Sequence, residues 1–441
     1  MKRTAILVAC CTTVLAGALA GALAARSTKS APDSTAPAVG ADDVAAEAGR
    51  RDADIAFFER RVGEDPASAA DRARLAALYL RRARETGGFT DVERAADQAK
   101  RSLALRDNRN EGTYVTLTSA LLAQHDFAGA LDAARALVAA SPEVSSHLAL
   151  LGEVLLEVGR YDEAARAFAL VERDTATLST APRLTRWYEL TGHLDRARTM
   201  ARYAVRLTSG RDDMSAEQRA WFLLRAGELE AKAGASATAD SLFDAGLAIF
   251  PDDYRLLAAK ARLAAGRSDW KGSIELAERA ITVQLEPGTL GLIRDAWAAL
   301  GDTAQASSYA RAMTASALAQ PGAIHRAWGL HLVDRGERVP EVLRRVRLEL
   351  ETRRDVYGYD LEAWALHALG RNAEAWTSME KALAQGTEDA QLSYHAGAIA
   401  SALGRTATAR EHLARALALN PSYQHAADVR ARLAALSDAA Y

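Results

Sequence analysis

Cysteine is nearly absent from this 441-residue sequence. Its two cysteines, Cys10 and Cys11, are adjacent and lie close to the amino terminus. The remaining sequence therefore has no residues for a disulfide framework, a cysteine-ligated zinc site or a thiol nucleophile. A body without cysteine suits an oxidising compartment.

Proline is also scarce, with ten residues, and alternating runs of valine and isoleucine are missing. Alanine, leucine and arginine are abundant instead, and these residues favour helices. A sheet framework is therefore excluded, and the composition predicts an all-α fold.

An excess of one charge is lacking as well. The sequence has 55 basic and 57 acidic residues, for a net charge of −2. This balance argues against a general nucleic-acid or membrane-surface binder. The arginine run over 344–354 alternates with acidic residues, which indicates a solvated helix face with i,i+4 pairs.

Motifs of known catalytic chemistry are missing too. There is no glycine-rich phosphate loop, no H-E-x-x-H and no nucleophile elbow, and the nine histidines are scattered. We therefore predict no enzyme activity, no cofactor and no metal site. His367 and His395 are 28 residues apart and could meet across adjacent hairpins.

A regular spacing is what the sequence does contain. Glycines recur at Gly301, Gly336, Gly370 and Gly404, in steps of 35, 34 and 34 residues. The segment 390–421 reads as two amphipathic helices joined by a tight turn at Gly404. A period near 34 residues predicts stacked helical hairpins, each of which buries its faces only against its neighbours.

The segment 145–176 carries the markers of one family. It has Gly152 within the first helix, Gly159 and Tyr161 at the turn, Ala164 in the second helix and Phe168 four residues later. This pattern resembles the tetratricopeptide repeat, from about residue 67 to 423, in about ten units. The resemblance implies a right-handed α-solenoid, and the C-terminal block is similar to uncharacterised exported bacterial members of the family.

The first 25 residues are predicted to be an export signal or a membrane anchor. Lys2 and Arg3 precede an apolar run over 5–25 that is long enough to span a bilayer. The two alternatives, cleaved or retained, stay open, as does lipidation at Cys10. Either alternative predicts a protein that is exported, periplasmic or anchored to the membrane on its periplasmic side.

The other predicted segments follow from composition and from breaks in the period. We predict a flexible linker over 26–54, a first repeat array over 55–207 and a second over 219–423. An interrupting loop over 208–218 divides the arrays, with Ser215 and Gln218 as a capping box at its end. Residues 424–441 form a capping helix and tail.

The resemblance also implies a binding surface. In tetratricopeptide arrays the first helices of the hairpins line a concave groove that takes a peptide or a partner helix. The positions that usually face this groove are occupied here by Glu153, Leu156, Trp221, Leu224, Glu228, Asp360, Trp364, His367 and Tyr394. The alternative is that the aromatic members pack between hairpins. The Lys and Asn pattern that grips acidic chaperone tails is absent.

Three functions follow from this pattern. The first is a non-catalytic scaffold that binds a protein partner in the groove, outside the cytoplasm. The second is a structural or assembly factor that oligomerises through its outer face or its ends. The third is a small-ligand module with a pocket near Asp360, His367 and His395. The sequence predicts no nucleic-acid partner and leaves the oligomeric state open.

Overall fold

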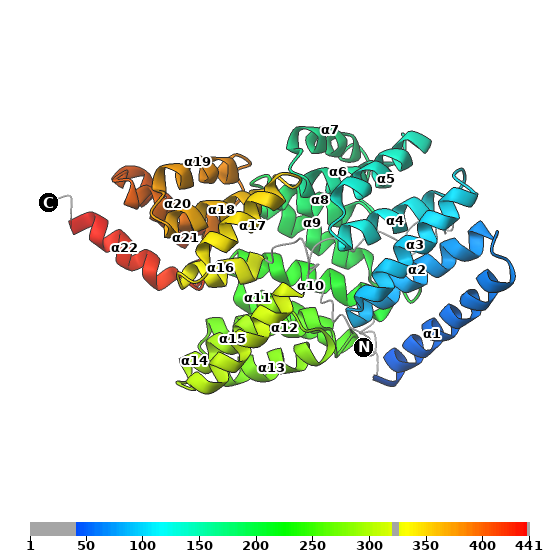
Figure 1. Cartoon of the computed structure of the whole chain (residues 1–441), viewed down its shortest axis with the longest axis horizontal. Coiled ribbons are helices and arrows are strands. Elements are labelled where there is room, and N and C mark those ends of the chain that lie inside the picture. The colour runs from blue at the N-terminus through cyan, green and yellow to red at the C-terminus, as the bar shows by residue number, and fades with distance from the viewer. Residues whose placement is uncertain (1–40, 320–325, 439–441) are drawn as a thin grey trace.

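The computed structural model describes residues 41–319 and 326–438. In these ranges the chain forms α-helices and no strand (Figure 1). The helices are α1 (Ala41–Glu64), α2 (Ala69–Thr86), α3 (Phe89–Leu105), α4 (Glu111–Ala123), α5 (Phe127–Ala140), α6 (Ser145–Glu157), α7 (Tyr161–Val171), α8 (Ala181–Leu190), α9 (Leu194–Leu207), α10 (Ala216–Lys232), α11 (Ser236–Ile249), α12 (Tyr254–Gly266), α13 (Trp270–Val283), α14 (Pro287–Ala299), α15 (Thr303–Leu318), α16 (Arg326–Asp334), α17 (Val339–Leu350), α18 (Val356–Ala368), α19 (Asn372–Leu383), α20 (Ala390–Ala402), α21 (Thr406–Leu419) and α22 (Ala426–Asp438).

Successive helices pair into hairpins, from α2 with α3 to α20 with α21. The predicted turn glycines end the first helix of their hairpins with positive φ: 84° at Gly301, 68° at Gly336, 73° at Gly370 and 70° at Gly404. Residues with a Cβ rarely adopt this left-handed conformation. The all-α fold of stacked hairpins is therefore confirmed for the described ranges.

Glycines inside the first helices allow the second helices to approach closely. A Cβ at Gly152 would lie 2.7 Å from the ring of Phe168, and one at Gly227 would lie 2.3 Å from that of Phe243. Both rings are almost fully buried. The small residue and the aromatic residue of the repeat pattern are thus two halves of one contact.

The amino-terminal part differs from the prediction. Helix α1 begins at Ala41, so the segment 41–54, predicted as part of the linker, is helical. Alanine favours the helix, and Arg51, 5% exposed, forms an ion pair with Glu85 of α2. The predicted signal or anchor and the remainder of the linker lie outside the described residues. Among the described helices, none combines the length and apolarity that a membrane span requires.

The predicted interruption after α9 is a loop but does not divide the array. Helix α10 begins at Ala216, and Ser215 and Gln218 form the predicted capping box. Helices α9 and α10 pack on each other, with Ala204 and Ala220 in one apolar cluster. The array is therefore continuous through this point.

Segments far apart in the sequence also meet. The Thr387 hydroxyl donates to the carbonyl of Leu190 at 2.6 Å, and the Asn420 amide donates to that of Ala231 at 3.1 Å. Side-chain hydrogen bonds of this kind join residues 189 to 197 positions apart. At about 34 residues per hairpin this is about six hairpins. The solenoid therefore coils so tightly that its second superhelical turn rests on its first (Figure 1).

We call this contact the seam. On one side of the seam are tight turns inside hairpins of the first superhelical turn, at Gly159, Gly192 and Gly234. On the other side are loops that connect hairpins of the second superhelical turn, at 353–356, 386–389 and 420–421. A Cβ at Gly159 would lie 2.1 Å from the Arg354 carbonyl oxygen. The two superhelical turns are thus in backbone contact.

Candidate functional site

The nine residues predicted to face a groove lie on first helices of the hairpins, and most of them are buried. We call the first helices, which contact one another from hairpin to hairpin, the inner helices and the second helices the outer helices. Seven are buried, namely Glu153, Leu156, Trp221, Leu224, Asp360, Trp364 and Tyr394, while Glu228 and His367 are half-exposed. The assignment of these residues to partner binding stays a prediction. What the structure gives is their contacts within the chain.

Four of the nine come together in one cluster around a histidine that is not among them. His395 of α20 is fully buried, and its Nδ1 lies 2.7 Å from a carboxylate oxygen of Asp360. The ring of Trp364 stacks on His395 with 4.0 Å between centroids, and that of His367 stacks on Trp364 at 5.1 Å. The ring centroids of Tyr394 and Trp364 are 5.7 Å apart. We call these five residues the histidine cluster.

Polar contacts hold the histidine cluster in place. The Trp364 Nε1–H donates to Asp334 at 2.7 Å, and the Tyr394 hydroxyl donates to Asp428 at 2.6 Å. Arg326 donates to the second carboxylate oxygen of Asp360 at 2.6 Å. Burial opposes ionisation of Asp360, but His395 and Arg326 lower its pKa. The Nε2 of His395 has no hydrogen-bond partner among the residues that the structure describes.

The other five predicted residues lie on the first superhelical turn and do not join this cluster. Glu153 accepts a hydrogen bond from Arg183 at 2.8 Å, and burial raises the pKa of this carboxyl. Leu156 and Leu224 are each 1% exposed, and Trp221 packs in an apolar cluster with Phe222. Glu228 forms an ion pair with Arg225. These contacts are packing between neighbouring helices, one ion pair between helices at Glu153 and one within α10 at Glu228.

A buried ion network spans the seam, and the sequence reasoning missed it. Glu189 lies within 3.2 Å of both Arg225 and Lys232, and Lys232 also lies 3.1 Å from Asp389 of the second turn. Burial alone would raise the pKa of Glu189, but Lys232, Arg186 and Arg225 together lower it far below its usual range. The pKa of Asp389 is lowered by Lys232 against the opposing effect of burial.

A second ion pair lies on the seam itself. Arg353 donates to the carboxylate of Glu157 at 3.0 Å and to the carbonyl of the same residue at 3.3 Å. The Tyr161 hydroxyl accepts from the backbone N–H of Val356 at 3.0 Å. The side chains of Glu157 and Glu189 are 5% and 8% exposed, which is unusual for carboxylates and requires such partners. The 34-residue period carries no signal for these pairs, because they join different superhelical turns.

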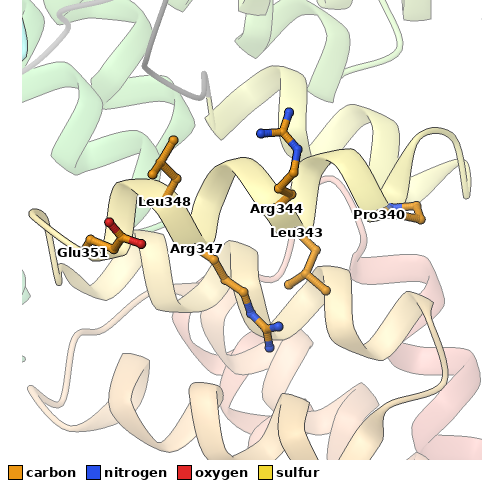
Figure 2. Close-up of a pocket in the computed structure, with 6 residues that line it drawn as sticks. All are labelled: Pro340, Leu343, Arg344, Arg347, Leu348 and Glu351. Atoms are coloured by element: carbon orange, nitrogen blue, oxygen red, sulfur yellow. The ribbon is translucent and has the colours of Figure 1, made fainter.

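A shallow hollow lies on the outer helix α17 rather than on the inner side. It is lined by Pro340, Leu343, Arg344, Arg347, Leu348 and Glu351, and Figure 2 shows Arg344 and Arg347 pointing to different sides of the helix. None of these belongs to the predicted site. The predicted i,i+4 pairs occur beside it, with Arg345 to Glu341 at 3.0 Å and Arg353 to Glu349 at 3.1 Å.

Metal-ligating residues do not gather within the described ranges. No three histidine, cysteine, aspartate or glutamate side chains there are arranged to hold an ion. The charges at the seam instead neutralise each other in ion pairs. Such a surface can hold polypeptide, as the seam does with the backbone of its own chain.

No family model matches the sequence, and no curated protein matches it. Among solved structures, yeast Tom70 aligns with a TM-score of 0.35 at 10% identity, over 84% of this chain and 95% of its own. Cut9–Hcn1, an APC/C hetero-tetramer, gives 0.33 at 12% identity, over 88% and 94%. A tetratricopeptide repeat protein from Parabacteroides merdae gives 0.34 at 16% identity, over 58% and 97%.

Scores and identities this low carry no argument about function. The tetratricopeptide-like character of the chain rests on its own geometry: paired helices, left-handed turn glycines, and the contact of Gly152 with Phe168. This chain is a solenoid of tetratricopeptide-like hairpins whose two superhelical turns are joined along a seam.

Proposed function

We propose that this protein is a non-catalytic scaffold outside the cytoplasm that binds a partner protein on the inner side of its superhelix. One observation supports the proposal: the carboxyl ends of first helices of the hairpins already bind polypeptide along the seam. The loops at 353–356 and 386–389 are held there by hydrogen bonds to backbone carbonyls and by ion pairs. A partner segment with similar features would be recognised by the same chemistry.

The burial of the predicted residues decides where a partner can make contact. Trp364 and Tyr394 are 8% and 5% exposed, so a partner reaches their rings only after the histidine cluster rearranges. Glu228 and His367 are half-exposed and are reachable as the chain stands. These two residues are therefore the right positions at which to test the inner surface.

The test places a photo-crosslinking amino acid at position 228 or 367 of the full chain, in its native host envelope. Positions 275 and 412, Glu275 and His412 on the outer helices α13 and α21, are the matched controls. We expect the same protein to be cross-linked from both inner positions and from neither outer one.

The partner so identified is then titrated against purified variants. Glu228→Ala with His367→Ala should weaken its binding, whereas Glu275→Ala with His412→Ala should not. Equal binding by both double variants, or cross-links from the outer positions alone, would refute the inner-surface proposal.

A further inference from the structure

The turns and loops of the superhelix are not all used by the seam. Turns at Gly159, Gly192 and Gly234 are covered, since a Cβ at each would meet another segment within 3.3 Å. A Cβ added at Gly301, Gly336, Gly370 or Gly404 would meet no atom of the described residues within 4 Å. We call these four second-turn positions the free turn edge.

The loops between hairpins show the reverse pattern. Second-turn loops at 353–356, 386–389 and 420–421 are engaged in the seam. First-turn loops at 106–109 and 141–144 are instead exposed or half-exposed. We call these two loops, with Leu105 beside the first, the free loop edge. The two free edges lie towards opposite ends of the long axis, with the first helices at one end and the last at the other (Figure 1).

Large apolar side chains are exposed on both free edges. On the free turn edge, Leu300 and Leu369 stand immediately before their glycines and are 41% and 37% exposed. On the free loop edge, Leu105 and Val144 are 47% and 39% exposed. Single exposed leucines are ordinary, but Leu300, Leu369 and the half-buried Leu403 recur at the same repeat position.

Three of the four free turns carry leucine at that position, and Arg335 precedes the fourth glycine; the covered turns carry no leucine there. There the residues before the glycine are Val158, Thr191 and Ala233, although these are the turns that contact another segment. Turns facing water normally carry polar residues. An alanine followed by a leucine at 299–300, 368–369 and 402–403 is therefore unexpected for a solvated edge and suits one that is covered.

We infer that a second copy of this chain covers the free turn edge, using its own free loop edge, so that the seam continues from one molecule to the next. The contact is head-to-tail, because one edge is built from turns and the other from loops. A contact of this kind leaves one free edge at each end and gives open chains rather than closed dimers. This inference does not depend on the partner proposed above.

Two single-edge variants of the full chain test it. Leu369→Asp places a charge on the free turn edge, and Val144→Asp places one on the free loop edge. Leu348→Asp is the matched control, because Leu348 is 53% exposed on α17 and lies on neither edge. Circular dichroism melts check that all three fold.

Sedimentation velocity over a concentration series is the measurement. The unchanged protein and Leu348→Asp should form a concentration-dependent series of oligomers. Each edge variant alone should associate about thirtyfold more weakly, as for loss of a central interface residue. An equal mixture of the two edge variants should form a dimer and nothing larger, since each supplies the edge that the other lacks.

Three outcomes would overturn the inference. One is an unchanged protein that stays monomeric at every concentration. Another is a loss of association in Leu348→Asp equal to that in the edge variants. The third is a mixture that forms no more dimer than each edge variant forms alone, because that result would mean that the two edges are not complementary.

Discussion

Glycine has two separate roles at the turns of this array, and a comparison of the first superhelical turn with the second distinguishes them. Gly159 and Gly370 adopt almost the same φ, 74° and 73°, at equivalent repeat positions. Only Gly159 is also in contact with another superhelical turn, where a Cβ would lie 2.1 Å from the Arg354 carbonyl oxygen. A pair of substitutions therefore isolates the contribution of the seam.

Gly370→Ala should lower the free energy of unfolding by about 1–2 kcal/mol, which is the cost of a left-handed residue with a Cβ. Gly159→Ala should cost about 1–3 kcal/mol more, because the backbone at Arg354 must also move. Urea unfolding of both variants at one pH measures the difference. Equal losses would mean that the close approach at Gly159 contributes nothing to stability.

Much of the residue pattern could be predicted from the sequence. The glycine period located the turns, and the pairing of Gly152 with Phe168 follows from the repeat. Packing between hairpins was the predicted alternative for Trp364 and Tyr394, and both are buried. Their stacking partners, His395 and His425, could not be predicted because they come from other repeats. Position within a repeat indicates which way a side chain points, but not what covers it.

At the scale of elements, helices α8 and α10 share an apolar cluster, and a charge network also joins them to the N-cap of α20. Glu189 and Asp389 are carboxylates with lowered pKa values, and Lys232 lies between them. Removing one partner from a buried network is costly because the others remain buried without compensation.

Glu189→Gln should lower the free energy of unfolding by about 3–5 kcal/mol at neutral pH. The matched control is Asp195→Asn, an exposed carboxylate on α9 paired with Arg198, which should change it by less than about 0.5 kcal/mol. Guanidinium unfolding measures both. A loss below about 1 kcal/mol in Glu189→Gln would mean that the network adds little net stability.

The same carboxylates predict an acid-sensitive fold. The pKa values of Glu189, Asp389 and Asp360 are lower in the folded chain than in the unfolded one, where they are about 4. Their contribution to the free energy of unfolding is therefore complete above that pH, and it is lost as the pH falls through their pKa values in the folded chain. When the free energy of unfolding is measured at pH 7, 5, 4 and 3, it should fall mainly below pH 4. The fall should be smaller in Glu189→Gln than in the unchanged protein.

The element boundaries show where sequence reasoning was weakest. Helix α1 begins in an alanine-rich segment that also reads as a linker, and its anchoring ion pair at Arg51 comes from the next helix. The loop after α9 breaks the period without separating its neighbours. In both cases contacts with other elements, not local composition, decide the structure.

At the scale of the molecule, the superhelix is closed by a contact that ordinary repeat arrays lack. Stability in a solenoid is usually the sum of repeats and their nearest-neighbour interfaces. Here residues 189 and 197 positions apart are bonded as well. The coiling results from a small rotation per hairpin summed over about six hairpins, so a local pattern does not predict it.

Bulky residues in the seam should therefore open the molecule. Gly159→Leu with Gly192→Leu should raise the radius of gyration measured by small-angle X-ray scattering and leave helix content unchanged. The control, Gly370→Leu with Gly404→Leu, carries the same backbone strain on uncovered turns and should keep the compact value. Data extrapolated to zero concentration remove any effect of association, and equal radii for both variants would contradict the seam as a closing contact.

The seam also restricts how this array can change its length. A solenoid without such a seam tolerates the gain or loss of a whole hairpin, because each repeat contacts only its neighbours. Here an extra hairpin between residues 160 and 350 would shift every second-turn loop to the adjacent turn. Arg353 would then leave Glu157, and Asp389 would leave Lys232. The number of repeats is thus fixed by pairings between the superhelical turns. Duplication of one repeat would break these pairings.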